Sequence, residues 1–291
     1  MTMPLLHIAG QGPEWLQWHL HPDVLVLVAG LLIAYWYAVV VWRPRISGAK
    51  RIGRSQAILY CSGVGVIYLA AGSPVHDLAE NYLFSVHMTQ HMLLSLVAPP
   101  LLLAGIPTWL YEAVLLRKGV VAVARVMLNP LVAIFSLNML LVITHLPHVV
   151  DYALTHHWFH FVVHALIVTA SVQMWWSVIT RVPGLPQLSY PYQMAYLFVQ
   201  SLVPSVIGSF ITFSSTPVYD FYAEAPRIWG MTAVEDQQVA AFIMKVIGSL
   251  ILWGFIGVAF FKWYERDQAD AKLPWSEVEQ ELSDLGLSPR A

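Results

Sequence analysis

Long apolar stretches separated by short polar segments run through the whole chain. Several of these stretches approach the roughly 20 residues that a helix needs to cross a bilayer. We therefore expect an all-α, polytopic membrane bundle of seven transmembrane helices. The expected spans cover residues 23–42, 55–72, 81–103, 130–148, 157–180, 192–213 and 236–264.

Composition agrees with a membrane protein. The chain is 58% hydrophobic and only 11% charged, whereas a soluble domain carries about 25% charged residues. We expect an interfacial N-terminal segment over 1–22, a transmembrane domain over 23–264 and a polar cytoplasmic tail over 265–291. Lipid is therefore the expected surrounding. The net charge of −2 gives no indication of a nucleic-acid partner.

Lysine and arginine lie almost entirely on one side of this topology. They occupy the first, third and fifth loops and the segment after the last span, whereas Arg227 stands alone on the other side. Cytoplasmic loops carry the Lys/Arg excess. The pattern therefore predicts an N-terminus outside and a C-terminus in the cytoplasm, as an odd number of spans also requires.

The third expected span carries two histidines, His87 and His91, four residues apart. This spacing places both imidazoles on one helix face, and Met88 and Met92 repeat it on the adjacent stripe. Polar groups inside a span are costly and usually face the bundle interior. The pattern indicates a metal or cofactor site. The alternative is a pair of histidines hydrogen-bonded to neighbouring helices.

The fifth expected span carries a second such pair, His160 and His164. With a rise of about 1.5 Å per residue, His164 and His87 both lie roughly 10 Å below the outer end of their spans. If the two helices are neighbours, the pairs offer two to four imidazole nitrogens to one site.

Further candidate ligands stand near the same side of the membrane. His145 lies at the end of the fourth span, His76 lies in the loop before the third, and Met244 lies in the seventh. Asp77 and Asp151 are candidate acceptors that orient an imidazole. We expect His7, His19 and His21 to be interfacial or exposed.

The ligand types favour copper. Imidazole suits zinc, copper, iron and nickel, and thioethers favour Cu(I). Histidines flanked by methionines on the oxidising side of a membrane therefore fit copper, as Cu(I) or Cu(II). The single cysteine, Cys61, allows neither an internal disulfide nor a thiolate cluster.

Several of these segments resemble the seven-span cytochrome c oxidase assembly factors called CtaG. The resemblance spans about residues 18–264. It rests on Ser-Pro-Val-His over 73–76, on His-Met-Thr-Gln-His-Met-Leu-Leu over 87–94 and on Ala-Pro-Pro-Leu over 98–101. Later parts agree: His145 with Pro147, the pair before Trp175 and Trp176, and Asp-Gln-Gln over 236–238 with Met244.

The resemblance implies a non-catalytic protein of the bacterial plasma membrane that serves the maturation of a haem-copper oxidase. Its expected cargo is copper for the oxidase catalytic subunit. That subunit, a periplasmic copper carrier and a second copy of the chain are the expected partners. The resemblance carries candidate ligand roles to His76, His87, His91, His145, His160 and His164.

Four alternatives stay open at this point. A copper transporter needs ligands in the inner half of the bilayer, where the sequence has almost none. A b-type cytochrome needs one histidine from each of two facing helices per haem, which the depths of His87 and His164 permit. A membrane metalloenzyme of the di-iron kind needs carboxylates, which are scarce in the spans. A scaffold for the oxidase subunit is compatible with any of these.

Overall fold

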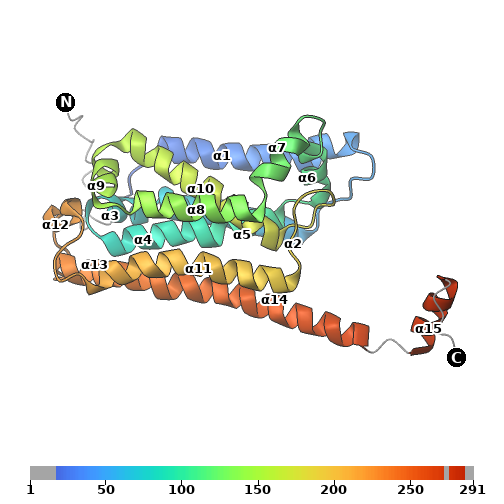
Figure 1. Cartoon of the computed structure of the whole chain (residues 1–291). Coiled ribbons are helices and arrows are strands. Elements are labelled where there is room, and N and C mark those ends of the chain that lie inside the picture. The colour runs from blue at the N-terminus through green and yellow to red at the C-terminus, as the bar shows by residue number, and fades with distance from the viewer. Residues whose placement is uncertain (1–17, 272–274, 286–291) are drawn as a thin grey trace.

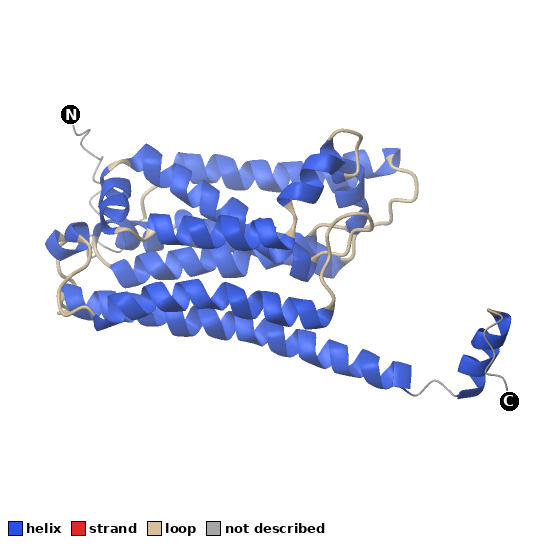
Figure 2. Ribbon diagram, viewed as in Figure 1, coloured by secondary structure: helices blue, strands red, loops and turns tan. Residues whose placement is uncertain are grey.

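The computed structural model describes residues 18–271 and 275–285, and these form helices joined by short loops, with no strand among them (Figure 2). The expected interfacial segment therefore lies largely outside the described residues, as do 272–274 and 286–291 of the expected tail. The α-helices are α1 (Pro22–Trp36), α2 (Arg54–Ala71), α3 (Pro74–Asn81), α4 (Phe84–Met92), α5 (Ala98–Gly105), α6 (Thr108–Leu115), α7 (Val120–Met127), α8 (Pro130–Thr144), α9 (Pro147–Thr155), α10 (His157–Ile179), α11 (Tyr190–Phe213), α12 (Asp220–Glu224), α13 (Ala233–Phe242), α14 (Gly248–Ala271) and α15 (Trp275–Asp284).

Shorter helical turns of other kinds continue some of these helices. Tyr37–Trp42, Leu93–Val97 and Ile243–Ile247 are π-helical, and Arg43–Arg45 is a 3₁₀ turn. The second of these joins α4 to α5, and the third joins α13 to α14. Each junction therefore makes one long, continuous span out of two α-helices.

The long helices lie side by side in an elongated bundle (Figure 1). The short helices α3, α9 and α12 lie at one end, and α6 and α7 lie at the other. Five helices are long and apolar enough to cross a membrane, or up to seven if each of two bent helix pairs counts as one span. The expected all-α membrane bundle is confirmed, with five to seven candidate spans in the described part of the chain.

Local sequence encodes both bends. Helix α3 turns by 42° from α2, and α8 turns by 61° from α7. Pro74 and Pro130 occupy the first position of the new helix, where a missing N–H is harmless. The Ser73 and Asn129 side chains accept backbone N–H groups of that first turn, at 3.2 and 2.9 Å, as N-cap residues do.

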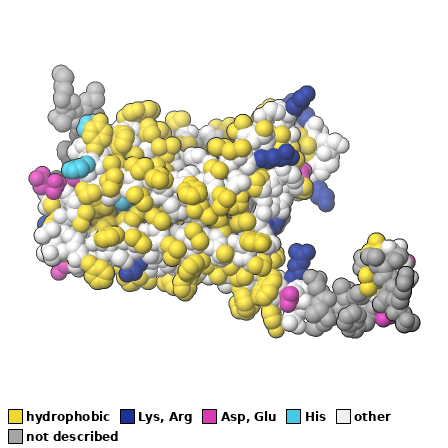
Figure 3. Space-filling model, viewed as in Figure 1, with side chains coloured by type: hydrophobic (Ala, Val, Ile, Leu, Met, Phe, Trp, Pro, Cys, Tyr) yellow, Lys and Arg dark blue, Asp and Glu magenta, His cyan; other side chains and the backbone are white. Residues whose placement is uncertain are grey.

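Basic side chains and histidines lie at opposite ends of the described surface (Figure 3). On the face shown, a broad apolar surface covers the side of the bundle. Lys and Arg gather at the end that holds α6 and α7, whereas histidines are visible at the opposite end. The two ends of the bundle therefore differ in charge as the sequence predicts, and which end faces outward stays a prediction.

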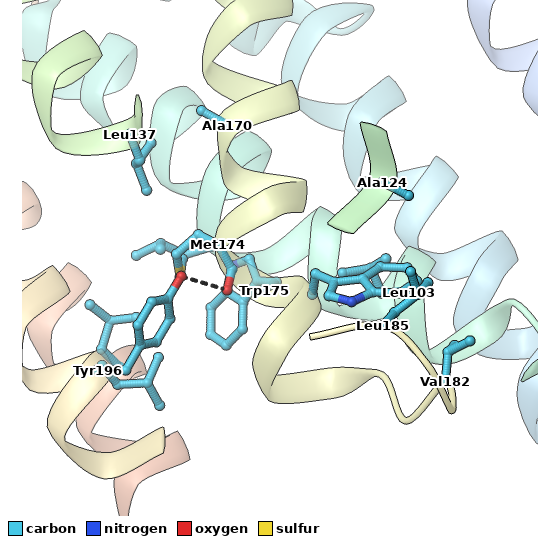
Figure 4. Packing of buried hydrophobic residues seen from close by; sticks show 13 residues of the cluster. Leu103, Ala124, Leu137, Ala170, Met174, Trp175, Val182, Leu185 and Tyr196 are labelled. Atoms are coloured by element: carbon cyan, nitrogen blue, oxygen red, sulfur yellow. Dashed lines mark hydrogen bonds between the residues drawn. The ribbon is translucent and has the colours of Figure 1, made fainter. Parts of the chain in front are cut away.

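The largest hydrophobic core lies around Trp175, which is completely buried (Figure 4). Met174 and Tyr196 pack in the same cluster, and the Tyr196 hydroxyl donates to the Met174 carbonyl at 3.0 Å. This core joins α10 to α11 and leaves the neighbouring turns of α10 with little freedom to rotate.

A buried carboxylate fixes the start of α4. Asp236, on α13, is 1% exposed and accepts the backbone N–H groups of Phe84 at 2.7 Å and Ser85 at 3.0 Å. An anion at a helix N-terminus satisfies free N–H groups and interacts favourably with the helix dipole. This contact sets the height of α4, and therefore of its histidines, relative to α13.

We predict that Asp236→Asn lowers the free energy of unfolding by about 1–3 kcal/mol, because an amide cannot accept both N–H groups as the carboxylate does. The loss is measured as a decrease in the apparent Tm of the purified protein in detergent. Glu224→Gln, at an exposed site, is the matched control and should leave Tm unchanged. Equal Tm values for the two variants would contradict the anchoring role of Asp236.

Candidate metal centre

Two neighbouring helices bring four imidazoles together. His87 and His91 come from α4, and His160 and His164 come from α10. Ring centroids lie 4.5 Å apart for His87 and His91, 4.8 Å for His91 and His164, 4.2 Å for His164 and His160, and 5.5 Å for His160 and His87. We call these four residues the histidine cluster.

Each imidazole of the histidine cluster has a buried nitrogen without a hydrogen-bond partner. These atoms are Nδ1 of His87 and Nε2 of His91, His160 and His164. Ligand atoms of His87, His91 and His164 all lie within 4.8 Å of one another. Native proteins leave few buried polar atoms unpaired, so four such nitrogens in one place are the donor set expected of a cation site.

Glu80 orients one of these imidazoles. Its Oε1 lies 2.9 Å from His160 Nδ1 and 3.2 Å from His76 Nε2. A carboxylate that accepts the Nδ1 proton leaves the lone pair of His160 on Nε2. Metal-binding histidines characteristically donate their other N–H to a carboxylate or carbonyl, and His160 is arranged in this way.

Sequence analysis missed Glu80, although a signal was present. Glu80 stands four residues after His76 on the short α3, so the two side chains share a helix face. Of the two acceptors expected from the sequence, Asp77 contacts imidazoles outside the histidine cluster, and Asp151 contacts a backbone N–H group. Asp77 lies 3.0 Å from His19 Nδ1, and Asp151 accepts the backbone N–H of Phe221 at 3.0 Å.

His76 and His145 surround the cluster in different ways. Both ring nitrogens of His76 are engaged, Nδ1 with Gln90 Nε2 at 3.0 Å and Nε2 with Glu80. His76 therefore supports Glu80 and has no free nitrogen in this arrangement. His145 donates from Nδ1 to the Leu141 carbonyl at 2.7 Å, which leaves its lone pair on Nε2. Its ring lies 6.4 Å from that of His91.

Two of the histidines expected to be interfacial or exposed contact a carboxylate. His19 and His21 both approach Asp77, at 3.0 and 3.7 Å, and the His21 ring lies 4.8 Å from that of His76. The Asp77 carboxylate raises the pKa of His21 above its ordinary value, although burial opposes this effect. A protonated imidazole has no free lone pair, so this group is a weaker candidate ligand than the histidine cluster.

Two cavities border the histidine cluster on different sides. A cavity of about 300 Å³ between α1, α2, α3 and α10 is lined by Glu80, His160 and His164. We call it the glutamate cavity. A smaller cavity of about 40 Å³ is lined by His91, His145 and Met244. We call it the methionine cavity. Met244 therefore lies on the His91 side of the cluster, away from Glu80.

The π-helical segment Leu93–Val97 follows the α4 histidines directly, and a specific contact stabilises it. Pro99 and Pro100 have no N–H, so neither the i+4 nor the i+5 residue can donate to the Ser95 carbonyl. The Trp175 indole Nε1–H donates to this carbonyl instead, at 2.9 Å. The bond connects the turn below His91 to α10 and satisfies a buried acceptor, which would otherwise destabilise the fold.

Comparison with known proteins identifies the family. Residues 33–266 match the family of cytochrome c oxidase caa3 assembly factors (Caa3_CtaG), and the chain belongs to this family. The resemblance expected from the sequence is confirmed.

Two mycobacterial relatives extend the comparison. An uncharacterized protein of Mycobacterium bovis and one of Mycobacterium tuberculosis are each 24% identical over an alignment of 284 positions that covers 90% of this chain. The matched region is 42% of each relative, so the chain spans less than half their length. No solved structure matches.

We predict that Trp175→Phe destabilises the protein more than Trp176→Phe does, by about 1–2 kcal/mol. Both indoles are almost fully buried, but Trp176 Nε1 has no hydrogen-bond partner. The two substitutions remove the same volume, and only the first leaves the Ser95 carbonyl unpaired. Apparent Tm values of the purified variants measure the difference. An equal loss from both would show that the Ser95 bond contributes little.

Proposed function

We propose that this member of the caa3 assembly-factor family binds copper at the histidine cluster. It would deliver the metal to, or support the maturation of, the copper centre in the catalytic subunit of a haem-copper oxidase. The observation that carries the proposal is the set of four buried imidazole nitrogens without protein partners. Neutral imidazoles suit copper among the transition metals, and family membership supplies the oxidase.

The spacing of the rings favours a bare ion over haem. A haem held by two histidines needs room for its macrocycle between the two imidazole rings. In the histidine cluster each ring lies 4.2–5.5 Å from the next, centroid to centroid. A single ion fits between nitrogens at such distances, whereas a planar macrocycle would require α4 and α10 to separate.

The ligand set also argues against di-iron catalysis. Among the described residues, Glu80 is the one carboxylate within hydrogen-bonding distance of the histidine cluster, and it already accepts from two imidazoles. Di-iron carboxylate sites in helix bundles use several glutamates from different helices. We therefore propose a binding protein and not an enzyme.

The cluster is arranged for release as well as binding. His160 and His164 line the glutamate cavity, so a bound ion would remain accessible from one side. A closed tetrahedral site holds its metal permanently, which would be unsuitable for a protein that passes copper on. We propose that the histidine-bearing end faces the periplasm and that a copper carrier supplies the ion there.

We predict that the purified protein binds about one Cu(II) ion per chain after loading, with no Soret band, because the cluster can supply the three or four nitrogens of one copper site. His87→Ala combined with His91→Ala should abolish this binding. His148→Ala, at an exposed site, is the control and should retain it. Metal analysis and the visible spectrum measure the outcome. Failure of the wild-type protein to bind copper would overturn the site, and a Soret band would favour haem.

We predict that Glu80→Gln weakens copper affinity by about 10- to 100-fold, the usual effect of removing a carboxylate that orients a ligand histidine. Competition with a chelator of known affinity measures the change. Asp77→Asn removes a nearby carboxylate with no contact to the histidine cluster and should change affinity little. Equal losses in the two variants would indicate a general charge effect and not an orienting role.

A cellular test separates copper delivery from simple support of the oxidase subunit. A bacterium that lacks its own copy of the protein is supplied with the wild type or with the His87→Ala/His91→Ala variant. We predict that the variant is inserted normally in the membrane while the copper content of the purified oxidase decreases severalfold. A variant that binds no copper and still restores the oxidase fully would falsify the delivery proposal.

A further inference from the structure

The methionine cavity has the properties of a second metal site. We infer that it binds a monovalent soft cation, Cu(I) in the cell, through the thioethers of Met88, Met92, Met174 and Met244 together with His91. The choice of copper rests on the proposed function, but the site is separate from the histidine cluster and shares only His91 with it.

The fold gathers these thioethers from elements far apart in the sequence. Of the ten methionines in the chain, four line this one cavity. Met88 and Met92 come from α4, Met174 comes from α10, and Met244 comes from the π-helical segment Ile243–Ile247. Met88, Met174 and Met244 are each at most 2% exposed. The sequence pattern on α4 supplies only half of the set, and tertiary packing supplies the rest.

Met92 holds the central position among them. It packs against the hydrophobic cluster that contains Met174 and also against the one that contains Met88 and Met244. Its Sδ lies so close to α14 that a Cβ atom added at Gly248 would be 3.1 Å from it. A glycine at this position therefore leaves the space that the sulfur occupies.

The uncharged lining of the cavity favours an ion of low charge. It contains no Asp, Glu, Lys or Arg. The cost of burying an ion rises with the square of its charge, so a divalent ion here costs about four times as much as a monovalent one. Thioethers are soft ligands that prefer Cu(I). The glutamate cavity differs, because Asp23 and Glu80 line it.

The size of the cavity limits what can bind. Its volume of about 40 Å³ holds an ion or a few waters, since a cavity needs about 10–15 Å³ to hold one water. A larger organic ligand would not fit. His145 also lines this cavity, and its Nδ1 donates to the Leu141 carbonyl, so its Nε2 offers a second neutral nitrogen to the same ion.

The test uses Ag(I), a monovalent probe that does not change oxidation state, on the full purified chain. X-ray absorption at the silver edge reports sulfur neighbours, and metal analysis reports stoichiometry. We expect sulfur scattering from the wild type. The triple variant Met92→Leu, Met174→Leu and Met244→Leu should lose this scattering and bind about one Ag(I) fewer per chain. Met-to-Leu changes conserve volume and are usually tolerated in a core.

The matched control is a second triple variant, Met127→Leu, Met139→Leu and Met194→Leu, which removes three methionines outside the cavity. It should retain the sulfur scattering of the wild type. If the first triple variant does not fold, Met174→Leu alone should reduce the sulfur shell. Absence of sulfur scattering in the wild type, or an unchanged sulfur shell in the Met92, Met174 and Met244 variant, would overturn the second site.

A further variant separates this inference from the proposed function. His87→Ala combined with His164→Ala disables the histidine cluster but leaves every lining residue of the methionine cavity in place. We expect this variant to lose Cu(II) binding and to keep methionine-dependent Ag(I) binding. If the wild type binds no Cu(II), the proposed cluster site fails, while persistent sulfur scattering would still support the methionine site. Loss of that scattering in the His87 and His164 variant would show that there is only one site.

Discussion

The contact between Glu80 and two imidazoles is the interaction on which the candidate centre depends. One carboxylate oxygen accepts from His160 Nδ1 and His76 Nε2, so it determines both the tautomer and the orientation of His160. The Gln90 side chain on α4 approaches His76 Nδ1 from the other side. The chain Gln90–His76–Glu80–His160 therefore connects α4 to α10 through α3, and the free nitrogens of the histidine cluster are positioned by bonds that lie outside it.

The histidine cluster contains buried polar atoms without hydrogen-bond partners, and contacts around it restrain the helices that carry it. Four imidazole nitrogens lack partners, and each such atom destabilises a folded protein when buried. Nearby contacts restrain the same two helices. Asp236 caps α4 above the histidines, and Trp175 binds the Ser95 carbonyl below them. These contacts hold the two helices in place despite the cost of the unpaired nitrogens, and a bound cation would offset that cost.

The two sides of the histidine cluster offer different chemistry to a metal ion. Carboxylates and imidazoles line the glutamate cavity, while thioethers and uncharged groups line the methionine cavity. His91 belongs both to the cluster and to the lining of the methionine cavity. A copper ion would therefore meet harder ligands on one side and softer ligands on the other, which favours different oxidation states at neighbouring positions.

The sequence by itself determined the helical membrane class, the separation of charge between the two ends and the pairing of histidines on single helix faces. All three follow from composition or from helical periodicity, which are local properties. Only the tertiary structure decided that α4 and α10 are neighbours, that His76 supports Glu80 and that Met244 lies on the far side of His91. The four-residue spacing of His76 and Glu80 is visible in the sequence. The direction in which the two side chains point depends on the 42° bend between α2 and α3. Contacts between distant segments arise from how whole helices pack, and periodicity within one helix does not specify its neighbour.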